Sequence, residues 1–516
     1  MKHLKNIKSV SLALACMFFL STCTSTFDEM NTNPNATTQV KSSMLATKVI
    51  KDMVTTIWEY NEFLSRRMFW GEQINNAQYN RFGADDFSYI QKLTDAKAMM
   101  DLALEEDKDA YTGLYYFMKG WNFWRCTLSM GDIPYSQALD IETYRYPAYD
   151  NQKDVFAGIL SDLEKADEFF AKAGSRTFEG DPFYKGDPAK WRMATNVLRL
   201  KVLISLSKRA DDTPELNIKE KFANVVAQGV LFQSNDDNLQ VVYSDKQGQQ
   251  NPFHNSFVKS INEYAGSSLL IDPLKKFEDY RLFYYFSPAQ ALTDKLYLPE
   301  GETLLDVGDW NAYQGLDVAA VFGEESKKIA NKMHCRPNGI YRLNYAGVPY
   351  IRLGYADMNF TIAEAIERGW LQGDAKKYYE EGIRASFRFV KSTVPAEYRN
   401  NREITDEYIE KYLQGPYVKY NETGSSTDRL KQIWIQAYIA RYYHMQYDDY
   451  YDYRRNQYPE FPINPDTNLN DDKTKIPMRW QYPENELLFN KEEYLAALQR
   501  QWGGTDNVNN VMWLLK

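Results

Sequence analysis

Apolar side chains recur every three or four residues through much of this chain, and that spacing places them on one face of an α-helix. Residues 155–170 show the pattern clearly, because phenylalanine, isoleucine and leucine are separated there by charged and polar positions. Residues 191–206 have the same character and follow Pro188, a residue that suits the first turn of a helix. The pattern predicts an all-α fold whose core is built from amphipathic helices.

One stretch has the pattern of a helical hairpin. Residues 355–368 form one predicted helix, residues 369–374 a turn that contains glycine, and residues 375–390 a second helix. Small residues on the first helix and large ones on the second favour the close packing of a tetratricopeptide-type hairpin. Residues 111–138 and 150–173 show the pattern more loosely. Because the repeat period of roughly 34 residues is absent, we expect tetratricopeptide-like hairpins and no regular solenoid.

Residues 231–344 break the helical pattern, since glycine, proline, asparagine and aspartate are scattered there among aromatic residues. Residues 458–483 do the same over a shorter length. We therefore expect a large irregular, loop-rich insertion at about 231–344. Recognition residues concentrate on loops that a rigid scaffold holds in place, so the insertion is the expected binding face.

The start of the chain predicts where the protein is located in the cell. Lysines at positions 2, 5 and 8 precede an apolar run at 10–20, which is too short to cross a bilayer of ~30 Å and indicates an export signal over residues 1–22. The sequence Leu20-Ser21-Thr22-Cys23 looks like a bacterial lipobox, although Thr22 departs from the usual small residue. It predicts that Cys23 becomes the lipid-carrying first residue. Residues 23–43 then form a polar tether, and residues 44–516 the helical domain.

Composition and net charge exclude some classes of function. The 516 residues are 44% hydrophobic and 25% charged, as in globular proteins, and the formal net charge of -9 argues against a nucleic-acid binder. The 39 tyrosines exceed what a core can hide with its hydroxyl groups satisfied, so we expect some of them to line a surface.

The usual catalytic and metal-binding motifs are missing from the sequence. The four histidines have no paired spacing, and neither a nucleophile elbow nor a nucleotide-binding glycine loop is present. We therefore predict no enzyme, no cofactor and no metal. A carboxylate pair for glycoside hydrolysis stays open, because spacing along the chain does not report distance in the fold. The acids Asp448, Asp449 and Asp452 and the loop pair Asp471 and Asp472 are interpreted as solvated surface acids, with calcium ligands as the alternative.

Two cysteines remain for the folded domain, Cys126 and Cys335. Two separate buried thiols are favoured, and a disulfide is the alternative.

The tyrosines of residues 438–453 follow helical spacing, which indicates a core or partner-facing position before a ligand-facing one.

Several motifs in order resemble those of the SusD/RagB family of outer-membrane nutrient-binding lipoproteins. They are the lipobox at Cys23, the start Phe27-Asp28-Glu29-Met30-Asn31-Thr32-Asn33-Pro34-Asn35, Gly131-Asp132-Ile133-Pro134-Tyr135, residues 188–199, Ala363-Glu364-Ala365 with Gly369-Trp370 and residues 379–386, Asp452-Tyr453-Arg454-Arg455 with Tyr458-Pro459, and residues 479–490. The resemblance covers nearly the whole chain after residue 23. It implies a lid on a SusC-like TonB-dependent transporter that captures oligosaccharides or peptides at the cell exterior without catalysis. A secreted helical glycoside hydrolase and a pure scaffold protein are the competing hypotheses.

The resemblance also implies where the ligand binds. The family's binding face is formed by a loop after the first long helix and by the irregular middle region, which correspond here to residues 69–82 and 306–316. Candidate ligand contacts combine aromatic rings with amides and an arginine, a mixture that suits a polar ligand with flat apolar patches. These candidates are Trp70, Gln73, Asn76, Tyr79 and Arg81 in the first loop, and Trp310, Asn311 and Tyr313 in the second.

Overall fold

The computed structural model describes residues 40–54, 58–445 and 447–516. The predicted signal peptide, Cys23 and the tether up to residue 39 lie outside the described residues, so those assignments stay predictions. Among the described residues, no helix combines the length and the apolar content that a membrane span requires.

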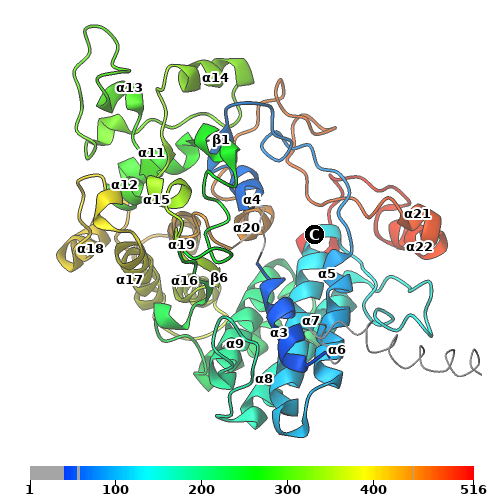
Figure 1. Cartoon of the computed structure of the whole chain (residues 1–516). Helices are drawn as coiled ribbons and strands as arrows, with labels where there is room; N and C mark the ends of the chain where they lie inside the picture. The colour runs from blue at the N-terminus through cyan, green and yellow to red at the C-terminus, as the bar shows by residue number, and fades with distance from the viewer. Residues whose placement is uncertain (1–39, 55–57, 446) are drawn as a thin grey trace, which may run out of the picture.

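Helices dominate the structure, and the all-α prediction is confirmed (Figure 1). The first half contains α3 (Ser42–Lys51), α4 (Trp58–Leu64), α5 (Ser88–Gln91), α6 (Leu93–Asp101), α7 (Lys108–Met130), α8 (Gln152–Ala173), α9 (Pro188–Ser205) and α10 (Ile218–Gln228). Helices α7 and α8 form the long hairpin that the looser pattern indicated. Gly113 and Gly120 of α7 face Phe170 and Leu163 of α8, and a Cβ atom at either glycine would come within 3 Å of those side chains. The glycines therefore let the two helices pack closely.

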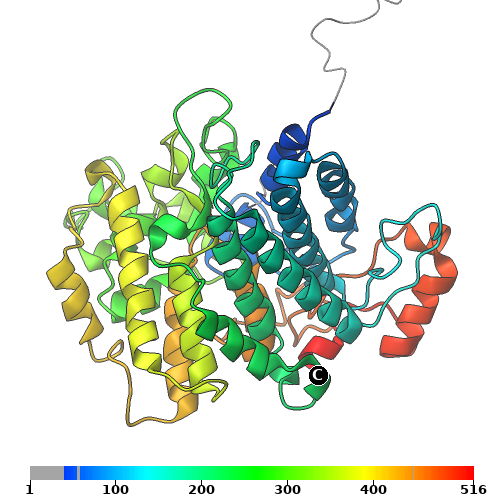
Figure 2. The same cartoon turned by 90° about the horizontal axis from the view of Figure 1, so that it is seen from below.

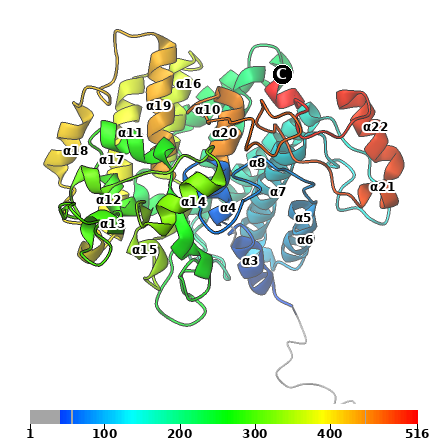
Figure 3. The same cartoon turned by 90° about the horizontal axis from the view of Figure 1, so that it is seen from above.

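The second half contains α16 (Tyr355–Glu367), α17 (Ala375–Thr393), α18 (Asp406–Leu413), α19 (Ser426–Ala440), α20 (Asp448–Asn456), α21 (Glu486–Phe489) and α22 (Lys491–Trp502). The predicted hairpin is confirmed as α16 and α17. Gly369, with a φ of 72°, follows the first helix, and the Asp374 side chain accepts a hydrogen bond from the Lys377 amide to cap the second. Helices α21 and α22 project at one edge of the molecule in all three views (Figures 1, 2 and 3).

Residues 231–344 hold only short elements. The helices there are α11 (Ser268–Lys276), α12 (Arg281–Tyr285), α13 (Gln290–Thr293), α14 (Phe322–Ala330) and α15 (Gly339–Arg342). Single 3₁₀ turns across the chain are η1 (Glu105–Asp107), η2 (Ser207–Arg209), η3 (Pro214–Leu216), η4 (Asn235–Asp237), η5 (Lys259–Glu263), η6 (Trp310–Ala312), η7 (Ala396–Tyr398) and η8 (Trp513–Leu515).

Three antiparallel strand pairs pin this irregular region together and to the helical frame. Strand β1 (Met68–Trp70) pairs with β3 (Tyr264–Gly266), β2 (Leu239–Val241) with β6 (Tyr350–Leu353), and β4 (Phe286–Ser287) with β5 (Arg336–Pro337). Because β1 follows α4 and β6 precedes α16, two of these pairs join the irregular region to segments outside it.

Two large hydrophobic clusters form the core. One lies among α3 and α6–α10, and the other among α11, α12 and α16–α20. The tyrosines of residues 438–453 confirm the core interpretation, since Tyr438, Tyr442, Tyr443 and Tyr450 are buried in the second cluster. Cys126 lies in the first cluster and Cys335 in the second, and both are free thiols. Two separate buried thiols, the favoured alternative, are thus confirmed.

Candidate ligand-binding site

Trp70 and Tyr79 of the first predicted loop pack into the protein. Trp70 ends β1 and is half-buried, with its ring 6.1 Å from Phe63 in a stacked pair and 5.8 Å from Tyr264 in an edge contact. Tyr79 is only 3% exposed and donates a hydrogen bond to the Ala320 carbonyl at 3.2 Å. Burial raises the pKa of Tyr79 to about 12. The prediction that Tyr79 offers a ligand platform is corrected, because its ring belongs to a small hydrophobic cluster under the loop.

The polar candidates of that loop are exposed. Gln73, Asn76 and Arg81 all lie at the surface, so each remains a proposed ligand contact. The loop abuts residues 316–329, through the Tyr79 hydroxyl and a cluster that includes Leu316 and Ile329.

The second predicted loop also contains both buried and exposed candidate residues. Tyr313 is fully buried and donates a hydrogen bond to the Val307 carbonyl at 2.9 Å, so its predicted ligand contact is corrected to a structural role. Asn311 is exposed. Trp310 is half-buried at the start of η6, where the Asp309 side chain caps the turn by accepting from the Asn311 amide at 2.8 Å.

Trp310 lines an open cavity of about 470 Å³, whose wall is formed by the end of α11, the residues just before α12, part of α18 and residues 414–418. Six aromatic side chains form much of its wall: Phe277, Tyr280, Trp310, Tyr408, Tyr412 and Tyr417. Sugar rings present apolar C–H faces that pack on such rings, and a concave site lined by aromatic residues is the usual form of a small-ligand site. This cavity is the candidate binding site.

Contacts behind the cavity hold the rings in place. Tyr280 and Tyr408 stack with their centroids 3.8 Å apart, and the Tyr408 hydroxyl donates to the Glu278 carbonyl at 2.7 Å while accepting from the Tyr280 amide at 2.8 Å. Trp310 meets Phe283 edge-on at 4.7 Å. Tyr417 is different, since it is 51% exposed and can stack on a ligand without loss of core packing.

The structure does not join the two predicted loops into one cavity. Residues 69–82 contact the second loop only at its last residue, Leu316, and then the segment after it, whereas Trp310 packs against α12. Sequence reasoning missed Phe277, Tyr280, Tyr408 and Tyr417, which come from segments more than a hundred residues apart in the chain. The surplus of tyrosine is the signal that pointed to aromatic surfaces. Composition does not show which tyrosines lie there.

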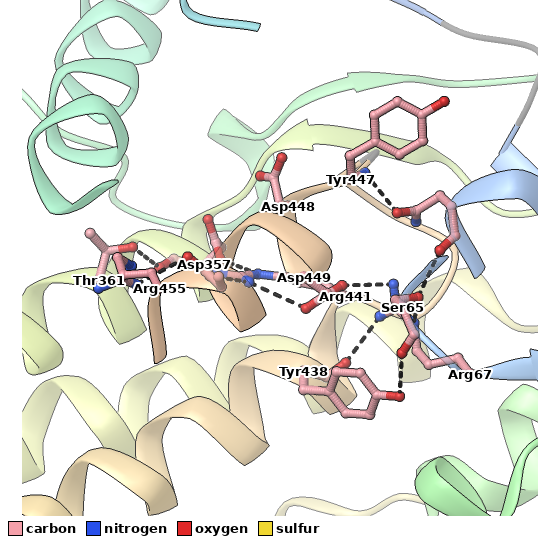
Figure 4. A network of polar contacts seen from close by, with 12 residues as sticks. Ser65, Arg67, Asp357, Thr361, Tyr438, Arg441, Tyr447, Asp448, Asp449 and Arg455 are labelled. Carbon is pink, nitrogen blue, oxygen red and sulfur yellow. Dashed lines mark hydrogen bonds and ion pairs between the residues drawn. The ribbon is translucent and has the colours of Figure 1, made fainter. Parts of the chain in front are cut away.

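The acids near position 450 are not at the surface, and their interpretation as solvated side chains was wrong. Asp448 and Asp449 on α20 are 6% and 5% exposed. Figure 4 shows Asp449 in a chain of polar contacts with Arg67 and Arg441, and Asp448 beside it on the same helix. Arg67 reaches Asp449 at 2.7 Å, and Arg441 reaches Asp452 at 2.6 Å.

We call this cluster the central ion network. Among the described residues it connects six cations with six carboxylates, so their formal charges cancel. Its members are Arg67, Arg125, Lys201, Arg368, Arg441 and Arg455, with Glu62, Asp357, Glu364, Asp448, Asp449 and Asp452.

The cations decide the charge state of Asp448. Burial alone would raise its pKa, yet Lys201 and Arg125 hold the pKa of Asp448 below its ordinary value. Each carboxylate of the network has a basic partner, which argues against calcium binding here. Among the described residues, no group of three or more histidine, cysteine or acidic side chains has the arrangement of a metal site. The network is structural.

The model of a SusD-like family, described as starch-binding associating with the outer membrane, matches residues 34–483. A SusD homolog from Bacteroides fragilis is 40% identical, with a TM-score of 0.87 over 92% of this chain and 100% of that one. Another SusD homolog from Bacteroides fragilis is 30% identical, with a TM-score of 0.80 over 93% and 100% of the two chains.

A chitin-binding protein shares the fold at 22% identity, with a TM-score of 0.68 over 92% of this chain and 96% of that one. The search of the curated proteins gave no significant match.

Proposed function

Since this chain belongs to the SusD-like family, described as starch-binding associating with the outer membrane, we propose that it is a lipid-anchored nutrient-binding protein of the cell surface. Its ligand is an oligosaccharide held in the aromatic cavity beside Trp310. The protein binds this ligand without cleaving it and delivers it to a SusC-like TonB-dependent transporter.

The aromatic cavity is the observation that supports ligand capture most directly. Its rings come from three separate segments and converge on one open space, and one of them, Tyr417, is half exposed. An exposed ring at the mouth of an aromatic-lined cavity is well placed to contact a ligand. Peptide binding is the second candidate, because stacked rings also accept apolar side chains.

Absence of catalysis is supported by the charges around the cavity. Glycoside hydrolysis uses two carboxyl groups, one as acid and the other as base or nucleophile. The cavity wall carries one acidic side chain, Glu278. A binding role therefore fits this wall better than a hydrolytic one.

Isothermal titration of the purified domain against a panel of oligosaccharides and peptides tests the proposal, with product analysis of the same mixtures. We expect saturable binding of a saccharide with no new reducing ends over hours. Steady product release would replace the binding protein with an enzyme, and binding of peptides alone would replace the ligand class.

Anchor and partner have separate tests. Mass spectrometry of protein from native membranes is expected to find acyl chains on Cys23 and no residues 1–22. Purification of the tagged, full-length chain from detergent-treated outer membranes is expected to bring down a TonB-dependent transporter. An unmodified N-terminal region that still carries residues 1–22 would contradict the anchor, and a tagged chain that purifies alone would contradict the partner.

A further inference from the structure

We propose that the aromatic cavity selects oligosaccharides that carry carboxylate or sulfate groups, an inference that rests on the proposed saccharide-binding function. Two lysines reach its wall. Lys276 ends α11 with its ammonium group 4.5 Å from the centroid of the Tyr417 ring. Lys411 lies on α18, one turn beyond Tyr408, and also lines the cavity.

Neither lysine is neutralised within the described part of the chain, since neither forms an ion pair with a described carboxylate. Glu278 is the acidic member of the wall. Other surface lysines are paired, for example Lys376 with Glu422 and Lys391 with Asp406. The wall therefore carries more positive than negative charge on a protein whose net charge is -9.

A third cation stands directly behind the rings. The Arg402 guanidinium lies 5.3 Å from the centroid of Tyr280 and 6.0 Å from that of Trp310. It donates to the Gly308 carbonyl at 2.8 Å and to the Tyr280 hydroxyl at 3.3 Å, and no described carboxylate pairs with it. The nearby Asp306 accepts from the Asn401 side chain and the Gly308 amide, and it is not part of the wall.

The cavity wall thus offers aromatic rings for stacking together with positive charges that favour an anionic ligand. An aromatic platform binds the apolar face of a sugar ring, and ammonium groups at its edge favour an anionic substituent on that ring. The protein as a whole carries a net negative charge, so we expect an anionic saccharide to be attracted to a site where unpaired lysines lie, as they do at this wall. Solvent screens lysine contacts, so each contributes no more than about 1 kcal/mol and weakens in salt.

The test compares oligogalacturonates and sulfated chondroitin oligosaccharides with neutral malto- and cello-oligosaccharides of equal length, by calorimetry at 50 mM and 500 mM NaCl. The double variant Lys276→Met, Lys411→Met keeps the alkyl stems and removes the charges. We expect it to weaken binding of an anionic saccharide roughly two- to fivefold per lysine at low salt, and to leave binding of neutral saccharides unchanged. The control Lys246→Met removes an exposed lysine outside the cavity wall and is expected to change neither.

Two outcomes separate this inference from the function beneath it. If neutral saccharides bind as well as anionic ones and the lysine variants match the wild type, charge selection is wrong while saccharide binding stands. If Tyr417→Ala changes the binding of no saccharide, or no saccharide binds at all, the cavity is not the site and both proposals fail.

Discussion

Burial changes the chemistry of single residues in this protein, and His334 shows it clearly. Its side chain is 3% exposed, and burial together with the charges of Arg336 and Lys332 lowers the pKa of His334 to about 4 from 6.5. The folded-state pKa lies below the unfolded value, so the unfolded chain takes up the proton first. Stability that is present above pH 6.5 is therefore lost as the pH falls from about 6.5 to 4.

We predict that His334→Leu makes unfolding less sensitive to acid. The wild type is expected to lose on the order of 3 kcal/mol through this residue between pH 7 and pH 4, and the variant is expected to lack that share. Urea unfolding at several pH values measures it. His334→Gln serves as the control, because it also cannot titrate and should share the reduced pH slope. Equal slopes in wild type and variants would contradict the prediction.

Tyr417 and Trp310 differ in how much their side chains contribute to the stability of the fold. We predict that Tyr417→Ala weakens saccharide binding at least tenfold with almost no change in melting temperature, because its ring is 51% exposed. Trp310→Ala is expected to weaken binding too, but with a stability loss of about 1–2 kcal/mol from its contact with Phe283. Calorimetry and thermal scans on both variants measure these effects. Tyr146→Ala, at another exposed tyrosine, is the matched control and should bind normally.

Sequence reasoning found Trp310 at the cavity but misjudged its neighbours. Tyr313 and Trp310 stand three positions apart in one loop, yet one is buried and the other reaches the cavity. Turn geometry decides which ring points inward, and residue type does not encode it. Tyr408 and Tyr417 could not be linked to Trp310 at all, because their proximity depends on how α18 packs beside α12.

At the scale of elements, the α16–α17 hairpin was predictable because its signals are local. Apolar spacing, a glycine after the first helix and a capping aspartate before the second all lie within forty residues. The short helices and strands of residues 231–344 were not predictable individually. Strand β3 is defined by its pairing with β1, almost two hundred residues earlier in the chain.

Close packing between α16 and α17 leads to a prediction at Gly382. A Cβ atom there would lie 2.7 Å from the Phe360 ring, so Gly382→Ala should destabilise the protein by about 1–3 kcal/mol although alanine favours helices. The matched control is Gly323→Ala in α14, where a Cβ atom meets open space and the same change should stabilise by about 0.5–1 kcal/mol. Denaturant unfolding of both variants measures the two signs. A stabilising effect at Gly382 would mean that the hairpin packs less tightly than described.

At the scale of the whole molecule, the central ion network joins the two halves of the fold. Asp448 on α20 contacts Arg125 of α7 at 2.6 Å and Lys201 of α9 at 2.8 Å, while Arg455 of the same helix pairs with Glu364 of α16. Helix α20 lies between these elements (Figures 1 and 3). The acids looked solvated in the sequence because their partners are spread over more than three hundred residues.

Breaking this network at its centre should destabilise the protein far more than breaking a surface pair. Arg441 contacts Asp357, Asp449 and Asp452, so Arg441→Met leaves buried carboxylates without their shared cation and is expected to cost about 3–5 kcal/mol. Lys97→Met removes an ion pair with Asp101 whose side chains are both 49% exposed, and should cost less than about 1 kcal/mol. Guanidinium unfolding measures both differences. Since desolvated charges are poorly screened, the gap between the two variants should persist in high salt, and equal, small losses in both would mean that water reaches the network.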